Sequence, residues 1–120
     1  MGSSILVVDD SKLARLMVTN LIVERWPQAQ IEEAESADEA FLAIEKNIPD
    51  HVIIDHNMPG MDGLDLARQL RDVAPQASLT LLTANIQVSI REQAEALGCR
   101  FIAKPVNEEK ISDLLAELGD

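Results

Sequence analysis

Ile5-Leu-Val-Val-Asp9-Asp10 is the most informative segment of the chain, because a four-residue apolar run ends there in two adjacent carboxylates. Such a run, with no polar alternation, is typical of a strand that is buried on both faces of a sheet. The pattern returns in His51-Val-Ile-Ile-Asp55. Open α/β sheets bind their ligands at the carboxyl ends of the strands. The two runs therefore predict a crevice that gathers Asp9, Asp10 and Asp55.

Three carboxylates in one crevice require a compensating charge. At an effective dielectric constant of about 20, two carboxylates about 4 Å apart repel each other by roughly 4 kcal/mol. A hard divalent cation relieves this repulsion, and Mg²⁺ prefers oxygen ligands. The sequence therefore predicts an Mg²⁺ site at the crevice, at which Mn²⁺ could substitute.

The composition limits the classes of protein to consider. The length of 120 residues suits a single domain over residues 1–120, with no output domain. The one cysteine, Cys99, excludes an internal disulfide and fits a cytoplasmic location. No apolar stretch approaches the roughly 18 residues of a membrane span. The net charge of −11 argues against direct binding to nucleic acid or to an anionic membrane.

Strands and helices are predicted to alternate five times along the chain. The predicted strands are Ile5–Asp9, Gln30–Ala34, His51–Asp55, Leu79–Thr83 and Arg100–Ala103. The predicted helices are Ser11–Trp26, Ala37–Asn47, Leu64–Val73, Gln87–Leu97 and Glu108–Leu118. Regular alternation of this kind indicates an α/β, doubly wound fold, in which helices cover both faces of a parallel sheet.

Local signals support these elements. Ser11, Ser36 and Asn107 are predicted helix N-caps, and Gly98 and Gly119 are predicted C-terminal caps.

Apolar spacing predicts which helix faces are buried. Leu13, Met17 and Leu21 share a face of the first helix, and we expect that face in the core. The last helix carries a similar row, formed by Ile111, Leu114, Leu115 and Leu118. The strand Gln30–Ala34 is more polar than the others, so we expect it at an edge of the sheet.

Other strand ends add groups of complementary chemistry. Leu81-Leu-Thr83-Ala84 ends in a hydroxyl, and Phe101-Ile-Ala-Lys104-Pro105 ends in an ammonium group. A turn-rich loop from Asn57 to Gly63 follows Asp55. Acids, a hydroxyl and a lysine together suit a divalent cation with a phosphoryl group.

These strand ends resemble a response-regulator receiver domain of two-component signalling. The resemblance covers essentially the whole chain, and four motifs in order carry it: Asp9-Asp10, Asp55-x-x-Met-Pro-Gly-Met-Asp-Gly, Thr83-Ala84 and Lys104-Pro105. It implies a flavodoxin-like sheet of five parallel strands in the order 2-1-3-4-5, with five helices on its two faces. It also implies a cis peptide bond between Lys104 and Pro105.

The resemblance implies roles around the phosphoacceptor. Asp55 resembles the residue that accepts a phosphoryl group from a partner's phosphohistidine. Asp10, Asp55 and the backbone carbonyl of Asn57 resemble direct Mg²⁺ ligands. Asp9 resembles a ligand that acts through water.

The resemblance also implies the groups that hold and report the phosphoryl group. Lys104, Thr83 and the backbones of Ala84 and Asn57 resemble the phosphate-binding groups. Thr83 and Phe101 resemble the switch pair, in which the hydroxyl moves to the phosphoryl group and the ring turns inward. Phe101 as a plain core residue stays an alternative, since an apolar strand residue needs no switch role.

Two further sets of residues belong to these expectations. Asn57 and Asn85 occupy the positions at which receivers tune the lifetime of the phosphoryl group. The two histidines, His51 and His56, are expected to be bystanders on opposite faces of their strand. Trp26 is expected to lie far from the site.

The implied function is a phosphoryl-accepting switch that catalyses only its own phosphorylation and dephosphorylation. Its expected partners are a histidine kinase or a histidine phosphotransfer protein, and a downstream target that meets a surface of helix 4, strand 5 and helix 5. Alternatives within the family are a shuttle in a phosphorelay, a receiver cut from a longer regulator or hybrid kinase, and a pseudo-receiver that only binds.

Two alternatives outside the family share part of this chemistry or this fold. A haloacid-dehalogenase-type phosphatase also uses an aspartate nucleophile, but its Asp-x-Asp signature is absent because His56 and Asn57 follow Asp55. A flavodoxin-like FMN binder would carry a Ser/Thr-rich loop where Asp9-Asp10-Ser11-Lys12 stands.

Overall fold

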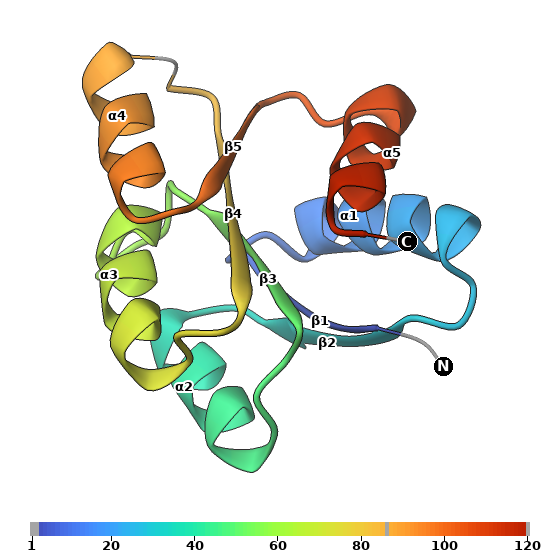
Figure 1. Cartoon of the computed structure of the whole chain (residues 1–120), viewed down its shortest axis with the longest axis horizontal. Coiled ribbons are helices and arrows are strands. Elements are labelled where there is room, and N and C mark those ends of the chain that lie inside the picture. The colour runs from blue at the N-terminus through green and yellow to red at the C-terminus, as the bar shows by residue number, and fades with distance from the viewer. Residues whose placement is uncertain (1–2, 86, 120) are drawn as a thin grey trace.

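The computed structural model describes residues 3–85 and 87–119, and within them it shows a parallel sheet of five strands (Figure 1). The strand order is β2-β1-β3-β4-β5, which confirms the expected α/β fold class. The strands are β1 (Ser4–Val8), β2 (Gln30–Ala34), β3 (His51–Asp55), β4 (Ser78–Thr83) and β5 (Arg100–Ala103). The helices are α1 (Lys12–Arg25), α2 (Ala37–Lys46), α3 (Gly63–Val73), α4 (Val88–Ala96) and α5 (Glu108–Glu117). Residues 1, 2, 86 and 120 of the expected single domain lie outside the described residues.

The apolar runs form the middle of the sheet. In the parallel register of β1 and β3, Val8 lies beside Ile54, and both side chains are fully buried. Helices α1 and α5 pack on one face of the sheet, and α2, α3 and α4 cover the other (Figure 1). Because helices cover both faces of the sheet, the central strands have apolar residues at consecutive positions. The polar strand β2 lies at an edge, as expected.

Side-chain caps begin most of the helices. The hydroxyls of Ser11 and Ser36 and the side chain of Asn107 each accept a hydrogen bond from a backbone N–H in the first turn, which confirms these N-caps. The cap of α3 was not predicted: Asp62 accepts from the Asp65 N–H at 2.9 Å. Gly98 has a positive φ of 73° after α4, which fits its predicted role as a C-terminal cap.

The predicted buried face of α1 is wrong. Leu13 and Met17 are 67% and 47% exposed, whereas the helix buries Arg15, Val18 and Ile22. Of the three predicted residues, Leu21 alone packs against the core, and it is half-buried. Apolar residues lie on several sides of α1, so periodicity alone cannot identify the side that meets the sheet. The prediction for the last helix holds for Ile111, Leu114 and Leu115, which are buried, while Leu118 is half-buried.

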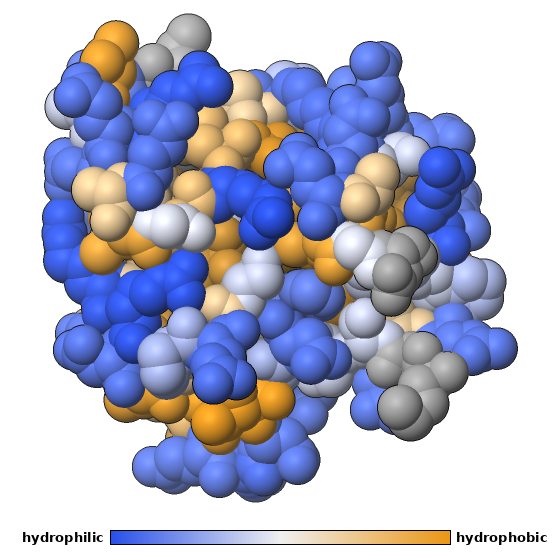
Figure 2. Space-filling model, viewed as in Figure 1, coloured by the Kyte–Doolittle hydropathy of each residue, from blue (hydrophilic) through white to orange (hydrophobic). Residues whose placement is uncertain are grey.

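The side of the molecule that Figure 2 shows is mostly hydrophilic, in keeping with the net charge of −11. An apolar patch lies on it over α2 and α3. A groove of about 450 Å³ lies there, lined by Phe41, Ile44, Glu45, Ile48, Gln69 and Val73. Ile48 and Val73 precede β3 and β4, so the groove lies toward the amino ends of the strands, away from the acids. Among the described residues, no helix is long and apolar enough to cross a membrane.

Candidate functional site

The acids predicted to share a crevice do meet at the carboxyl edge of the sheet. Asp9 follows β1, Asp55 ends β3, and carboxylate oxygens of Asp9, Asp10 and Asp55 all lie within 4.8 Å of one another. Asp9 and Asp55 are only 4% and 3% exposed, whereas Asp10 faces solvent. Two buried acids beside an exposed one make a site that is open on one side to an approaching ligand.

Lys104 supplies the positive charge at this edge. Its Nζ lies 2.6 Å from Asp55 Oδ1 and 3.9 Å from Asp9 Oδ2. The Lys104 N–H donates to the Thr83 carbonyl at 2.9 Å, which ties this residue to the end of β4. The Lys104–Pro105 peptide is cis, as expected. The ammonium group therefore stands where it pairs with the carboxylate of Asp55.

A second lysine, which the sequence analysis missed, holds the loop that presents Lys104. The Lys110 Nζ in α5 donates to the carbonyls of Ala103 at 2.7 Å and Pro105 at 3.0 Å. These two carbonyls flank Lys104 in the chain. The loop between β5 and α5 is thereby tied to the helix on both sides of the site lysine.

The electrostatics of the cluster oppose full ionisation. Burial raises the pKa of Asp9 above its ordinary value, and the neighbouring carboxylates of Asp55 and Asp10 act in the same direction. The hydrogen bond from the Ser11 backbone N–H and the charge of Lys104 lower it in part. One lysine does not neutralise three carboxylates, so the cluster keeps a net negative charge when all three are ionised and would attract a cation.

This raised pKa has a consequence for stability. Because the folded protein binds the Asp9 proton more tightly than the unfolded chain does, stability from this residue is lost as pH rises through the raised pKa. Asp9→Asn is neutral and keeps an oxygen for the Ser11 N–H. In EDTA at neutral pH we expect the variant to melt at a higher temperature than the parent, and the difference to shrink as pH falls toward 3.8, the ordinary Asp value. A lower melting temperature for the variant at neutral pH would contradict this account.

The residues present fit a hard divalent cation. The donors are carboxylate oxygens, which Mg²⁺ prefers, and they converge from two strand ends without any sulfur or imidazole ligand among them. Asp55 Oδ1 has an ion-pair partner in Lys104 but no directed hydrogen bond within the described residues. Asp9, Asp10 and Asp55 would therefore hold the ion.

Thr83 lies at the end of β4 and is fully buried. Its hydroxyl accepts a hydrogen bond from the Asn85 N–H at 2.9 Å, and no hydrogen bond joins it to the acids in the described part of the chain. The neighbouring Ala84 is exposed, and Asn85 is half-buried. The structure thus places the hydroxyl near the strand edge but engages it with the next loop.

The remaining predicted residues lie around this edge. Phe101 is half-buried in β5, and the guanidinium carbon of Arg91 lies 5.6 Å from the centre of its ring. Asn57 is exposed in the loop that follows β3. The structure therefore gathers Asp9, Asp10, Asp55 and Lys104 at one edge of the sheet, while the functional roles of these residues and of Thr83, Ala84, Asn57, Asn85 and Phe101 stay predictions.

Gly63 is a second contributor that the sequence analysis missed. A Cβ at this position would lie 2.7 Å from the Asp55 carbonyl oxygen, 2.7 Å from His56 Cα and 2.8 Å from Leu81 Cδ1. The Gly63 N–H also donates to the His56 carbonyl at 3.0 Å. The start of α3 therefore lies directly against the backbone at the end of β3. The sequence signal for it was its place as the last residue of the motif that follows Asp55.

Neither histidine joins the acid cluster. His51 begins β3, at the other end of the strand from Asp55, and its ring centroid lies 6.0 Å from that of Trp26. This contact also places Trp26 away from the site, as expected. His56 is buried directly after Asp55. Cys99 is buried, which raises the pKa of its thiol.

Comparison with known proteins gives one family for nearly the whole chain. Residues 5–116 match the family described as "Response regulator receiver domain". The chain is 28% identical over 116 residues to the chemotaxis protein CheY of Bacillus subtilis, and the match covers 96% of each protein. It is 32% identical over 101 residues to the transcriptional activator protein ExaE of Pseudomonas putida, covering 83% of this chain and 47% of ExaE. The chain therefore spans less than half the length of that relative.

Solved structures agree with this result. The structure of the chemotaxis protein CheY4 of Vibrio cholerae has a TM-score of 0.88 at 26% sequence identity, and the match covers 98% of this chain and 99% of that one. The BeF3-activated DrrB receiver domain has a TM-score of 0.85 at 20% identity, which shows a common fold.

Proposed function

The chain belongs to the response regulator receiver domain family, the phosphoacceptor switches of two-component signalling, and we propose that Asp55 is its phosphoacceptor. The observation that carries this assignment is the 2.6 Å contact between Lys104 Nζ and Asp55 Oδ1, beside two further acids. Asp55 is the buried member of the cluster that the lysine contacts most closely. The haloacid-dehalogenase alternative is not favoured, since the receiver match covers residues 5–116.

The transfer itself forms one bond and breaks one. An Asp55 carboxylate oxygen attacks the phosphorus of a partner's phosphohistidine, so a P–O bond forms while the P–N bond breaks and its electron pair stays on the donor's imidazole. When bound, Mg²⁺ supplies positive charge beside the phosphoryl oxygens. Asp10, Asp55 and the Asn57 carbonyl would hold the ion directly, and Asp9 would do so through water. Lys104 stays beside Asp55 and pairs with a phosphoryl oxygen.

The phosphoryl group then acts as a local charge change. It adds about −1.5 to −2 charge and three acceptor oxygens. The backbone N–H groups of Ala84 and Asn57 donate to these oxygens, and the Thr83 hydroxyl leaves the Asn85 N–H to do the same. This movement opens space beside β5 that the Phe101 ring fills. Small shifts of this kind bias packed elements between two arrangements.

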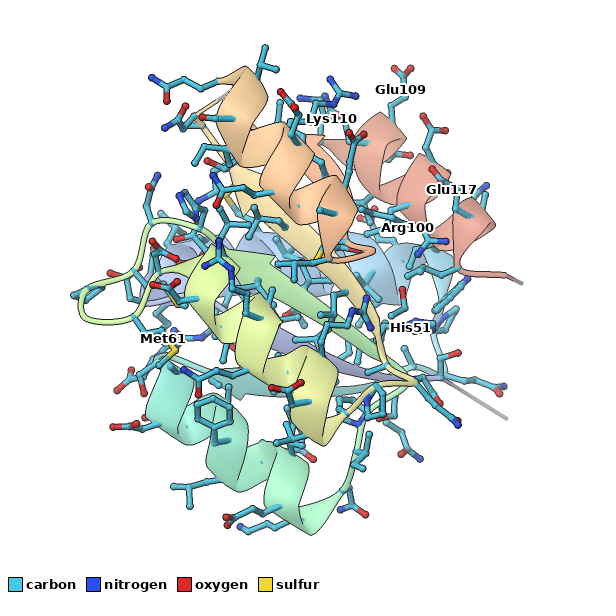
Figure 3. The ribbon with its side chains drawn as sticks, turned by 60° about the vertical axis from the view of Figure 1, so that its left-hand side comes forward. His51, Met61, Arg100, Glu109, Lys110 and Glu117 are labelled. Atoms are coloured by element: carbon cyan, nitrogen blue, oxygen red, sulfur yellow. The ribbon has the colours of Figure 1, made fainter. Side chains whose placement is uncertain are left out.

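The output surface consists of α4, β5 and α5. A hollow of about 260 Å³ lies between β5 and α5, lined by Arg100, Phe101, Ile102, Ala103, Lys110, Asp113, Leu114 and Glu117. Arg100 and Glu117 face each other across it, with Nε and Oε1 3.2 Å apart (Figure 3). Because Phe101 lines this hollow, a change in its ring would alter the surface that a downstream target meets.

The phosphodonor approaches from the side of α1. This helix starts two residues after Asp10, and Leu13, Leu16 and Met17 are 67%, 51% and 47% exposed on it. Exposed apolar residues beside an acid site suit a protein partner better than a small molecule. A histidine kinase or histidine phosphotransfer protein is the donor that this assignment requires. The protein itself catalyses only its own phosphorylation and dephosphorylation, in the cytoplasm.

The lifetime of the phosphoryl group is expected to depend on Asn85. Its backbone N–H donates to the Thr83 hydroxyl, and its side chain accepts from the Gln87 N–H at 3.0 Å, so it lies directly beside the hydroxyl that is proposed to move. We expect Asn85→Ala to change the dephosphorylation rate while the melting temperature changes little. The measurement is the decay of the phosphoprotein by intact mass after the donor is removed. An unchanged half-life would remove Asn85 from this role.

The test of the proposed function uses the chain with Mg²⁺ and a small phosphodonor such as acetyl phosphate. Intact mass should show one labile phosphoryl adduct that does not form in EDTA. No adduct in a folded protein would favour the binding-only alternative. Repeated release of phosphate from a phosphomonoester would favour a phosphatase instead.

A further inference from the structure

Arg15 is the charged residue that α1 buries against the sheet. It is 8% exposed, although arginine is seldom buried without partners. Its Nε lies 2.8 Å from Glu33 Oε1 in β2, and its Nη1 donates to the backbone carbonyl of Asp9. One guanidinium group therefore joins three segments: helix α1, the edge strand β2 and the turn that carries the acids.

The carbonyl that Arg15 contacts belongs to the peptide unit between Asp9 and Asp10. The rest of this turn is also held: the Asp9 N–H donates to the Ala34 carbonyl at 3.0 Å, and Asp9 Oδ1 accepts from the Ser11 N–H at 2.9 Å. Since a peptide unit is planar, fixing its carbonyl also fixes the direction in which the chain enters Asp10. Asp10 itself is exposed and has no side-chain partner among the described contacts.

We infer that Arg15 is a positioning residue for the cation site, and that Glu33 orients it. Arg15 donates with two edges of its planar group, one to the Glu33 carboxylate and one to the Asp9 carbonyl, so the acid turn cannot rotate without breaking a buried contact. Asp10 is thereby kept within reach of Asp9 and Asp55 before any ion arrives. This inference rests on the proposed cation site.

The pair acts through geometry because its charges cancel. A lone positive charge near the acids would oppose binding of a cation, but Glu33 neutralises it at 2.8 Å. Removing both charged groups therefore leaves the net charge at −11 and takes away only the support of the turn. Groups that hold the ligands of a metal are commonly worth 10- to 100-fold in metal affinity.

The test is a titration with Mg²⁺ alone, at constant ionic strength, followed by calorimetry and by the amide signals of Asp9 and Asp10. The variant is Arg15→Met/Glu33→Gln. The matched control is Arg68→Met/Asp65→Asn, which removes an ion pair of 2.6 Å from the exposed surface of α3 and also leaves the net charge unchanged. We expect the affinity for Mg²⁺ to fall by about tenfold in the first variant and to stay at the parent value in the control.

A merely structural role would give another result. In that case the Arg15→Met/Glu33→Gln variant would melt at a lower temperature but bind Mg²⁺ like the parent, and the inference would be overturned. If this variant does not fold, Arg15→Lys decides, because lysine keeps the charge but not the two-edged contact. Weaker binding by Arg15→Lys supports the positioning role, and parental binding overturns it. If the parent itself does not bind Mg²⁺, the proposed cation site fails and the inference falls with it.

Discussion

Asp55→Asn is expected to abolish the phosphoryl adduct completely. Asparagine has almost the shape of aspartate, but its amide is not a nucleophile for phosphorus, and it removes one of the three carboxylates that lie within 4.8 Å of one another. Among the residues that the structure describes, no other carboxylate lies as close to Lys104 as that of Asp55, at 2.6 Å, since Asp9 lies 3.9 Å away. Intact mass after incubation with Mg²⁺ and a small phosphodonor measures the result.

The fold should survive this change. Three acids compensated by one lysine repel one another in the metal-free protein, so losing one of them relieves repulsion of a few kcal/mol at most, as an order of magnitude. We therefore expect the melting temperature of metal-free Asp55→Asn to be no lower than that of the parent, which separates lost chemistry from lost structure.

A matched control comes from Asp62, the N-cap of α3. Asparagine caps helices about as well as aspartate does, so Asp62→Asn should fold and accept a phosphoryl group like the parent. An adduct of undiminished yield on Asp55→Asn would show that another residue is the acceptor.

Gly63→Ala is expected to cause the largest loss of stability among single methyl additions near the site. Its Cβ would lie 2.7 Å from two backbone atoms, the Asp55 oxygen and His56 Cα, and backbone atoms cannot turn aside as a flexible side chain can. Helix α3 must move away from β3, and overpacking of this kind costs about 1–3 kcal/mol, sometimes more. The free energy of unfolding in urea measures the cost.

The same movement reaches the acceptor. Because the clash is with the carbonyl of Asp55 itself, we expect Gly63→Ala to accept the phosphoryl group more slowly even where it is fully folded. The control is Gly60→Ala, which has a φ of 82° but no atom within 4 Å of the added Cβ. It should show only the backbone strain of about 1–2 kcal/mol. If Gly63→Ala and the parent were equally stable, α3 would not be packed tightly against the backbone of β3.

The central strands were predictable because a strand that is buried on both faces has an uninterrupted apolar sequence. The runs before Asp9 and Asp55 are apolar at every position, which a strand covered on both faces requires. The caps Ser11 and Ser36 were predictable for a similar reason, since an N-cap acts on a backbone N–H three residues away.

The helix faces show where local pattern fails. In α1, apolar residues occur both on the buried side, at Val18 and Ile22, and on the exposed side, at Leu13 and Met17. The hydrophobic pattern therefore named the wrong side. Arg15 is buried because its guanidinium group donates to the Glu33 carboxylate and to the Asp9 carbonyl. Both partners lie outside α1, Glu33 in β2 and Asp9 in the turn before the helix.

By itself, the sequence determined the order of the elements, the edge position of the polar strand and the carboxyl edge at which Asp9, Asp10, Asp55 and Lys104 meet. Hydrophobic periodicity depends on residues that are near one another in the chain, so it can be read from the sequence. In a parallel sheet the carboxyl ends of all strands lie at the same edge, so the position of that edge also follows from the sequence. Three features depended on how the chain packs. They are the face of α1 that is buried, the contact of Gly63 with the end of β3, and the hydrogen bond from Arg15 to the Asp9 carbonyl. Each of these depends on atoms from segments that are distant in sequence, and their distances are set only when the segments pack.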